Sequence, residues 1–595
     1  MLKEESVMAP ILYDAPKIEN MRDLFLISLE ENNNPRSFIL KDKIQRKEKY
    51  FDIYLEQFID DYEGLGAILL EKGFKDKRIG VCAENRYEWG VAYSSAICGL
   101  GLIVPIDKSL PYQEMEKILE RAELNVIITS YKQIDNILKL KEEGLNIPMI
   151  VLMDLYTSKK EQETIDEIML KYADKIVSMR KLIEEGKKIN KNKNEFRNLP
   201  IDNEKMAALL FTSATTSVSK AVMLSHKNIV SNVKDLRKMF YLDTNDRILS
   251  FLPMHHCFEC IVGFLLQMSC GTTICFAESL KSLSKNLKEY EISVMTGVPA
   301  LFEAIYNKII REIKKKNKYK AFKLAVKASN TLRMLGVDKR QEIFKDIHQN
   351  LGGSLRLLVS GAAPLNPKVE KGIFDLGIAI YQGYGLTETS PVISSGFDKY
   401  SHFGSVGKVV PSMQIKIDKI DDSNVGEILV KGPNVMLGYY NDEENNNAIF
   451  TKDGWLKTGD VGYIRDGYLF ISGRTKNVIV LKNGKNIFPD ESEALINNIE
   501  GVKESMVFGL PNKEDEQDIQ LTAKIVYDEE YFKDKTEKEI EEDIWKQIKE
   551  INKIQPTYKY IKNIFITKED LIKTTTLKIK RYEEMKKITK EFLNK

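Results

Sequence analysis

Segments with a helical period alternate with short apolar runs over most of this 595-residue chain. Residues 55–72 and 113–123 repeat apolar side chains every three to four positions, whereas 78–83 and 125–129 are apolar runs of strand length. Helices that separate buried strands typically cross over a parallel sheet, and one core cannot enclose so many residues. The pattern predicts an α/β fold with several parallel-rich sheets. Similar short runs recur at 149–153, 207–211, 248–252, 293–296 and 355–359.

The pattern of predicted secondary structure changes at about residue 404. Glycine-punctuated strand patterns with few helices follow, at 414–417, 426–430 and 468–471, and a mixed α/β pattern begins after Gly473. We therefore expect a large N-terminal domain over residues 1–474 that has several subdomains, one of them β-rich. A small α+β C-terminal domain, mobile relative to the first, is expected over residues 475–595.

Charge and composition narrow the class of partner. The 89 basic and 87 acidic residues leave a net charge of +2, so a small-molecule substrate is expected and a nucleic-acid partner is not. Residues 1–10 lack the apolar core of a secretory signal, which favours a cytoplasmic protein. The basic run at 311–320 leaves two interpretations open: a solvated helix face, or a peripheral contact with anionic lipid at the inner face of the membrane.

Two uncharged stretches, 89–106 and 260–277, approach the length of a membrane span. Glycine and small polar residues interrupt both, so we interpret them as buried helix-plus-strand segments. The cysteines lie mostly in apolar sequence without zinc spacing, and we expect buried reduced thiols.

A hydroxyl-rich loop that ends in lysine follows the apolar run at 207–211. Its sequence is Thr212-Ser213-Ala214-Thr215-Thr216-Ser217-Val218-Ser219-Lys220. Short hydroxyls and backbone N–H groups can converge on phosphoryl oxygens, while an ammonium neutralises charge on a leaving pyrophosphate. The chain has neither a Walker-type nor a three-glycine dinucleotide motif. Alone, the loop indicates either a phosphate site or a surface turn.

Three distant motifs add groups that suit a nucleotide. Tyr384-Gly385-Leu386-Thr387-Glu388 offers an aromatic face, a hydroxyl and a hard oxygen ligand for Mg²⁺. Ser360-Gly361-Ala362-Ala363 has no bulky side chain, so a planar base could lie against it. Thr458-Gly459-Asp460 places an acid where it could accept the hydroxyls of a ribose. Each could separately be an ordinary turn.

These motifs, in this order, resemble the superfamily of AMP-forming acyl-CoA synthetases, luciferases and adenylation domains over nearly the whole chain. The long helical stretch at 305–350 is similar to the corresponding stretch in the long-chain fatty acid CoA ligases. Further matching segments are Gly426-Glu427-Ile428, Gly432-Pro433-Asn434-Val435-Met436-Leu437-Gly438-Tyr439-Tyr440, Gly473-Arg474-Thr475-Lys476 and Lys573-Thr574-Thr575-Thr576-Leu577-Lys578-Ile579.

The resemblance implies a role for individual residues. The catalytic residues would be Lys578, which bridges the attacking carboxylate and the α-phosphate, Thr387, which contacts the α-phosphate, and Glu388, which binds Mg²⁺. Lys476 would be the hinge. The residues implied to bind ATP are Thr212, Ser213, Thr215, Thr216 and Lys220 at the phosphates, Gly361, Ala362, Ala363 and Tyr384 at adenine, and Asp460 and Arg474 at the ribose. His256, Val298 and Gly383 would border the substrate pocket.

The resemblance also implies the reaction. A fatty acid carboxylate attacks the α-phosphorus of ATP and expels pyrophosphate. A thiolate then attacks the acyl-adenylate and expels AMP. Coenzyme A would be the acceptor, with an acyl carrier protein as an open alternative because both present the same pantetheine arm. The resemblance does not imply an oligomeric state.

The phosphate loop departs from the family pattern. Ala214, Ser217 and Ala221 stand where the family has glycine, and an alanine forced into left-handed geometry costs about 1–2 kcal/mol. The side chains expected to touch phosphate are kept, so we expect an active enzyme with altered nucleotide affinity. A non-catalytic binder of acyl groups or nucleotides is the alternative.

Overall fold

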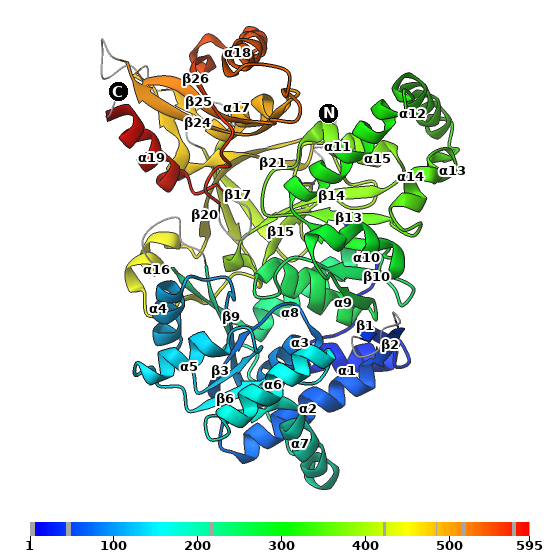
Figure 1. Cartoon of the computed structure of the whole chain (residues 1–595), viewed down its shortest axis with the longest axis vertical. Helices are drawn as coiled ribbons and strands as arrows, with labels where there is room; N and C mark the ends of the chain where they lie inside the picture. Colours follow the sequence, from blue (N-terminus) through cyan, green and yellow to red (C-terminus); the bar gives the residue numbers. More distant parts are fainter. Residues whose placement is uncertain are drawn as a thin grey trace.

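The computed structural model describes residues 6–42, 49–212, 219–419, 424–482, 485–512, 519–573 and 579–593. The segments coloured orange to red lie above a larger body in Figure 1. This arrangement confirms the predicted α/β fold class.

One parallel-rich sheet has the strand order β19-β9-β8-β4-β3-β5-β6-β7. Neighbours from β8 to β7 pair in parallel, and β9 and β19 extend the sheet in antiparallel fashion. Most of its strand residues are buried, as expected for a parallel sheet covered on both faces. The strands are β3 (Lys77–Cys82), β4 (Gly101–Pro105), β5 (Val126–Thr129), β6 (Met149–Leu152), β7 (Ile176–Ser178), β8 (Met206–Phe211), β9 (Ala221–Ser225) and β19 (Gly438–Tyr439).

A second sheet has the order β16-β15-β14-β13-β12-β10-β11-β1-β2. Its strands from β14 to β1 are parallel, and the edges are antiparallel. The strands are β1 (Arg36–Asp42), β2 (Lys49–Tyr54), β10 (Arg247–Ser250), β11 (Thr273–Phe276), β12 (Val294–Gly297), β13 (Leu357–Ser360), β14 (Ala379–Gly385), β15 (Val392–Ser395) and β16 (Lys408–Val409).

Smaller sheets follow from about residue 404, where the pattern of predicted secondary structure changes. An antiparallel sheet of order β17-β18-β20-β21 confirms the β-rich subdomain, and a sheet of order β24-β25-β26 lies in the C-terminal part. Strands β22 (Ile479–Val480) and β23 (Asn486–Ile487) form a separate antiparallel pair. The strands of the two sheets are β17 (Gln414–Lys419), β18 (Gly426–Lys431), β20 (Leu456–Arg465), β21 (Tyr468–Arg474), β24 (Val502–Pro511), β25 (Ile519–Tyr527) and β26 (Ile561–Thr567).

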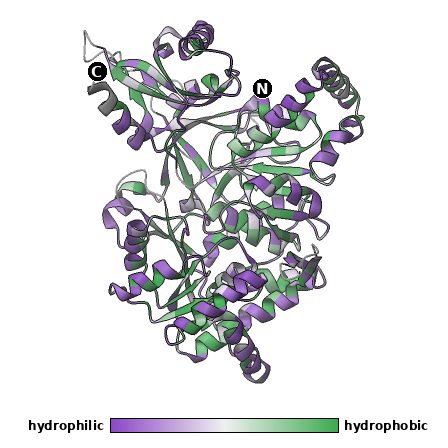
Figure 2. Cartoon of the chain, viewed as in Figure 1, coloured by the Kyte–Doolittle hydropathy of each residue, from purple (hydrophilic) through white to green (hydrophobic). Residues whose placement is uncertain are grey.

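Helices cover the large sheets, with apolar stripes turned inward and polar faces outward (Figure 2). In α4, for example, Met115, Ile118, Leu119 and Ala122 are buried at helical spacing. The α-helices are α1 (Met21–Glu31), α2 (Leu55–Glu71), α3 (Tyr87–Ser95), α4 (Tyr112–Ala122), α5 (Ile134–Glu142), α6 (Lys159–Lys171), α7 (Met179–Lys193), α8 (His226–Met239), α9 (Leu266–Ser269), α10 (Leu283–Glu289), α11 (Pro299–Lys315), α12 (Tyr319–Met334), α13 (Arg340–Ile343), α14 (Lys345–Asn350), α15 (Pro367–Asp375), α16 (Glu443–Ile449), α17 (Pro489–Ile496), α18 (Glu537–Lys553) and α19 (Arg581–Leu593).

The two uncharged stretches are buried helix-plus-strand segments, as predicted. The first contains most of α3, the π-helical turn η1 (Ala96–Leu100) and β4, and the second contains most of the π-helix η2 (Glu259–Leu265), α9 and β11. Across the described ranges, no helix combines the length and the apolar character that a membrane crossing requires. The free cysteines Cys82, Cys98, Cys257, Cys260, Cys270 and Cys275 are all buried, which confirms that interpretation.

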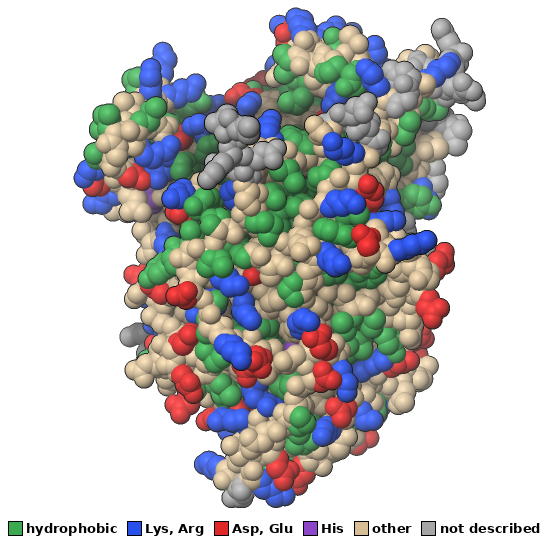
Figure 3. Space-filling model, turned by 180° about the vertical axis from the view of Figure 1, so that it is seen from behind, with side chains coloured by type: hydrophobic (Ala, Val, Ile, Leu, Met, Phe, Trp, Pro, Cys, Tyr) green, Lys and Arg blue, Asp and Glu red, His purple; other side chains and the backbone are tan. Residues whose placement is uncertain are grey.

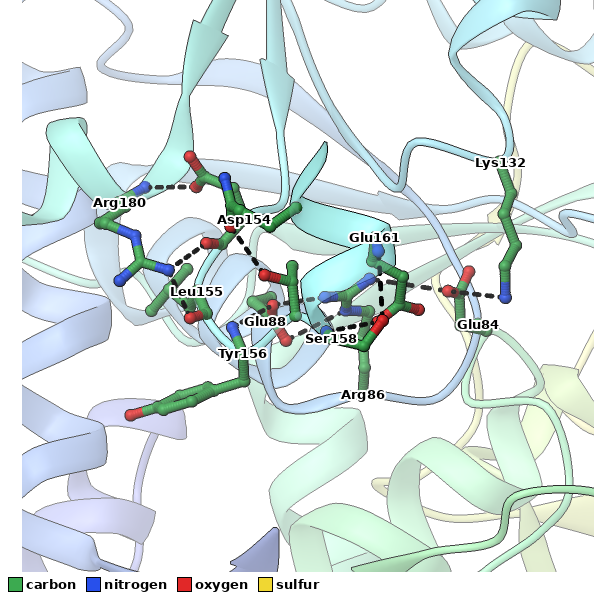
Figure 4. A network of polar contacts seen from close by, with 12 residues as sticks. Glu84, Arg86, Glu88, Lys132, Asp154, Leu155, Tyr156, Ser158, Glu161 and Arg180 are labelled. Carbon is green, nitrogen blue, oxygen red and sulfur yellow. Dashed lines mark hydrogen bonds and ion pairs between the residues drawn. The ribbon is translucent and has the colours of Figure 1, made fainter. Parts of the chain in front are cut away.

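A charged network joins α3 to the segment between β6 and α7 (Figure 4). Arg86 donates to both carboxylate oxygens of Glu88, at 3.0 and 2.5 Å, and the Glu88 side chain is only 1% exposed. The backbone N–H of Tyr156 also donates to Glu88. Further along, Asp154 accepts hydrogen bonds from Ser178 and the Arg180 backbone. The network therefore satisfies charges that have been withdrawn from water.

Candidate functional site

A cavity of about 570 Å³ lies where the two large sheets meet the β-rich sheet. Its lining includes Phe211 from β8, Thr296 from β12, Tyr384 from β14, Glu427 from β18 and Arg474 from β21. The volume is within the range of small-molecule sites. Of the predicted site residues, the lining brings together Thr212, Lys220, His256, Gly361, Ala362, Gly383, Tyr384, Thr387, Glu388, Arg474 and Lys476.

Lys220 and Glu388 both contact Tyr439 in the polar part of the lining. The Lys220 ammonium lies 4.4 Å from the centroid of the Tyr439 ring, and the Tyr439 hydroxyl donates to Glu388 Oε1 at 2.8 Å. Burial, with Lys476 as the second cause, lowers the pKa of Lys220. Burial and the neighbouring Glu388 raise the pKa of Tyr439, so this hydroxyl remains a donor at neutral pH. Tyr439 therefore holds a cation and a carboxylate close together in the cavity.

Asp460 connects Tyr384 to Arg474 at the edge of the cavity. The Tyr384 hydroxyl donates to Asp460 Oδ2 at 2.9 Å, and Arg474 Nε lies 3.1 Å from Oδ1. Asp460 and Arg474 are partners in the β20–β21 ladder, so strand register aligns them. Asp460 is 4% exposed and lies behind the lining. Burial and Asp460 raise the pKa of Tyr384, which keeps its hydroxyl protonated.

The turn after β13 brings backbone close to the cavity. A side chain at Gly361 would place its Cβ 3.0 Å from the Phe258 ring, so any larger residue would require this ring to shift. Ala362 has φ +73°, a left-handed conformation that is uncommon outside glycine. Such strain is characteristic of functional turns. Ala363 and Val298 do not line the cavity, and Val298, the residue before α11, is buried in a hydrophobic core.

Two histidines after β10 line the cavity beside a carboxylate. The rings of His255 and His256 are 4.2 Å apart, and His255 Nε2 lies 3.5 Å from Asp107 Oδ2. Asp107 also accepts a hydrogen bond from the Ser109 backbone. His255 and His256 therefore lie side by side at the cavity wall, with His255 tied to the loop after β4.

Part of the lining is apolar and was not singled out from the sequence. These residues, called the apolar wall here, are Leu236, Phe240, Leu242, Val262, Leu266, Val294, Leu357 and Val359. Leu236 and Phe240 are four positions apart at the end of α8, and Leu357 and Val359 are two apart on β13. Helical and strand periodicity could therefore have indicated them. Such a surface suits a hydrocarbon rather than a polar side chain.

Glu259 is buried at the start of η2 and contacts a residue of the lining. Ser250 donates to one of its carboxylate oxygens at 2.7 Å, and Thr296, which lines the cavity, donates to the other at 2.9 Å. Burial raises the pKa of Glu259 from 4.5 to about 7. The folded protein thus holds a proton here that the unfolded chain releases at lower pH.

Glu259→Gln is expected to remove part of the pH dependence of stability. Because the folded pKa is raised, the contribution of Glu259 is fully present below pH 4.5 and is lost as the pH rises through about 7. The variant should lose less stability between pH 5 and 8, by on the order of 3 kcal/mol. Urea unfolding of both proteins across this range measures the effect, and parallel pH curves would contradict it.

Several predicted residues lie outside the described residues, namely Ser213, Thr215, Thr216 and Lys578. The same holds for Ala214 and Ser217 among the departures from the family pattern. Ala221 is described: it begins β9, opposite Phe211, and is not among the residues with positive φ. Alanine is therefore compatible with the backbone at position 221.

Comparison with known proteins identifies the family. The AMP-binding enzyme family matches residues 46–440, and the AMP-binding enzyme C-terminal domain matches residues 476–592. The chain therefore belongs to the AMP-binding enzyme family. Long-chain-fatty-acid–CoA ligase 5 of Rattus norvegicus is 30% identical over 483 residues, which cover 77% of this chain and 69% of the relative. Long-chain-fatty-acid–CoA ligase 1 of Cavia porcellus is 29% identical over 523 residues, which cover 84% and 73%.

Solved structures share the fold. The anthranilate CoA ligase AuaEII, in complex with anthranoyl-AMP, superposes with a TM-score of 0.74 at 18% identity, over 97% of this chain and 98% of the other. ATP-bound MatB from Rhodopseudomonas palustris gives a TM-score of 0.71 at 21% identity, over 95% and 98%. These similarities concern the fold, and they agree with the predicted architecture.

Proposed function

We propose that this enzyme activates a long-chain fatty acid with ATP through an acyl-adenylate and transfers the acyl group to coenzyme A. The observation that carries the proposal is the cavity, in which a cation and a carboxylate share one continuous lining with the apolar wall. The polar part suits a polyphosphate and its metal ion, and the apolar wall suits an acyl chain. The names of the similar ligases support the same substrate class.

Each site residue takes a role in this proposal. Lys220 and the loop before it hold the phosphates, Tyr384 and the turn at Gly361 flank adenine, and Asp460 with Arg474 binds the ribose. Thr387 contacts the α-phosphate, Lys578 supplies charge to the transition state, and His256 borders the carboxylate. We place the junction of the two domains at 474/475, with Lys476 as the hinge.

Mg²⁺ fits the proposed site as a substrate-held ion. Within the described ranges, no group of three or more His, Cys, Asp or Glu side chains could hold a metal by itself. Mg²⁺ is commonly bound by one or two carboxylates together with phosphates and water. Glu388 would be the protein ligand, and Mg²⁺ would neutralise phosphate charge.

Glu388→Gln is expected to raise the Mg²⁺ concentration for half-maximal pyrophosphate exchange by about tenfold, because the amide carries no charge. Tyr439→Phe is the matched control, since it keeps the carboxylate and removes only its hydroxyl donor. Because the Glu388 carboxylate keeps its charge in this control, its Mg²⁺ requirement should rise by less than that of Glu388→Gln. Unchanged Mg²⁺ dependence in the Glu388 variant would exclude this residue from the metal site.

The function is tested by pyrophosphate exchange into ATP with carboxylates from acetate to long-chain fatty acids, with and without coenzyme A. Exchange should increase by up to about fourfold for each methylene that the apolar wall buries. AMP release should require coenzyme A. Exchange without a coenzyme A thioester would indicate a carrier-protein acceptor, and binding of ATP without exchange would indicate a non-catalytic protein.

A further inference from the structure

Helix α12 projects from the body together with α13 (Figure 1). Its inner face has partners in the fold. Phe322 packs against Phe344 with ring centroids 5.8 Å apart, and Asn330 Nδ2 donates to Asp375 at 3.1 Å. The Arg333 guanidinium lies 4.7 Å from the centroid of the Phe374 ring. The inner face thus fixes the rotation of α12 about its axis.

The outer face of α12 and the turn after it expose large apolar side chains. Leu324 is 69% exposed, Met334 85%, Leu335 75% and Val337 44%. Single exposed apolar residues are ordinary, but a group of them within one helix and its following turn marks an interaction surface. None of these residues lines the cavity, so the reaction does not account for them.

Positive charge surrounds this apolar surface. Residues 308–340 contain twelve Lys or Arg and two Asp or Glu, a net charge of +10, whereas the whole chain has +2. Of these, Arg333 lies on the inner face, and Arg311 and Lys314 pair with Glu530 and Glu500. The exposed Lys320, Lys323 and Lys327 lie on α12 next to Leu324. Figure 3 shows blue and green side chains together on the corresponding projection, at the upper left. Exposed lysines therefore flank the exposed apolar side chains of α12.

We propose that the outer face of α12 and the turn at 335–337, called the α12 surface here, binds an anionic lipid bilayer. Apolar side chains flanked by lysines are the pattern of interfacial helices, which bury the former at the headgroup boundary and pair the latter with acidic lipids. The charge decides the choice of occupant, because a second copy of the chain would bring like charge to the same surface. This inference goes beyond the proposed function and does not depend on it.

Vesicle flotation tests the α12 surface with the full-length protein. Vesicles of phosphatidylcholine alone are compared with vesicles that contain about 30% phosphatidylglycerol, at salt concentrations from about 0.05 to 0.5 M. The protein should bind the anionic vesicles, bind the neutral ones at least about tenfold more weakly, and dissociate as salt rises. Equal binding to both compositions, or no binding to either, would overturn the proposal.

Two sets of variants locate the contact. The combined change Lys320→Glu, Lys323→Glu and Lys327→Glu should weaken binding at least about a hundredfold, since each basic residue contributes separately. Met334→Ser with Leu335→Ser should weaken it at least about tenfold. The matched controls lie elsewhere: Lys181→Glu, Lys188→Glu and Lys191→Glu on α7, and Leu170→Ser on α6, whose side chain is 84% exposed. Equal losses in the controls would contradict the assignment to α12.

Pyrophosphate exchange with a short, water-soluble carboxylate should be unchanged in the α12 variants, which also reports that they are folded. Absence of exchange from the parent protein with every carboxylate, from acetate to long-chain fatty acids, would overturn the proposed function and leave vesicle binding unaffected. Sedimentation equilibrium tests whether the partner is instead a second copy of the chain. If the parent protein self-associates and the α12 variants do not, while vesicle binding is absent, the surface is an interface between copies and the bilayer proposal is wrong.

Discussion

Lys578→Ala is expected to slow adenylate formation by about 10²- to 10³-fold, the usual effect of removing one preorganised charge from a transition state. The proposed role is to neutralise charge between the attacking carboxylate and the α-phosphate. Thioester formation from supplied acyl-adenylate should be spared, because that step expels AMP after the role of the lysine has ended. Pyrophosphate exchange and thioester release measure the two steps separately.

Lys580→Ala is the matched control for this prediction. Lys580 lies two residues further along and forms an exposed ion pair with Glu583 at 3.1 Å, so its loss should leave both steps within about twofold. Equal loss of both half-reactions in the Lys578 variant would contradict a role confined to adenylation. It would instead point to a general effect on the position of the C-terminal domain.

Arg86→Met is expected to lower the free energy of unfolding by about 3–5 kcal/mol, the largest stability effect that we expect. The substitution leaves the buried Glu88 carboxylate without its bidentate partner. Burial alone would raise the pKa of Glu88, and Arg86 is the main group that holds it below 4.5. Urea denaturation of both proteins at pH 7 measures the loss.

Two further variants separate the buried pair from the rest of the network. Arg86→Met combined with Glu88→Leu removes both charges and should recover much of the lost stability. Glu84→Gln removes a carboxylate that is 26% exposed and 3.6 Å from Arg86, so its effect should stay below about 1 kcal/mol. A double variant no more stable than Arg86→Met would show that packing, rather than charge, determines the effect.

Local patterns predicted the elements that build the sheets. The apolar runs at 78–83 and 125–129 form β3 and β5, and the helical pattern at 55–72 forms α2. These features depend on residues close in sequence, where spacing carries the information. Strand β7 was not predicted, because it has three residues inside a lysine-rich stretch and its pairing with β6 is not local.

In the cavity, too, local motifs were predictable from the sequence and contacts between distant residues were not. The motifs indicated Lys220, Tyr384 and Glu388 as separate groups, and the fold brings them into one lining. The hydroxyl of Tyr439 was not predicted as the partner of Glu388, because the contact spans 51 positions and depends on β19 pairing with β9. Contacts of this kind follow from sheet order, which local periodicity does not determine.

Lys220 and Lys476 face the same cavity, one from the strand-to-strand loop of the large domain and the other from the segment that leads into the C-terminal domain. After burial, the charge of Lys476 is the second cause that lowers the pKa of Lys220. A polyanion between them would replace this repulsion with attraction to both. Bound ATP would then hold the large domain and the C-terminal domain together, and departure of pyrophosphate would weaken this contact. The loss of negative charge from the cavity, which accompanies adenylate formation, would thus also allow the C-terminal domain to move.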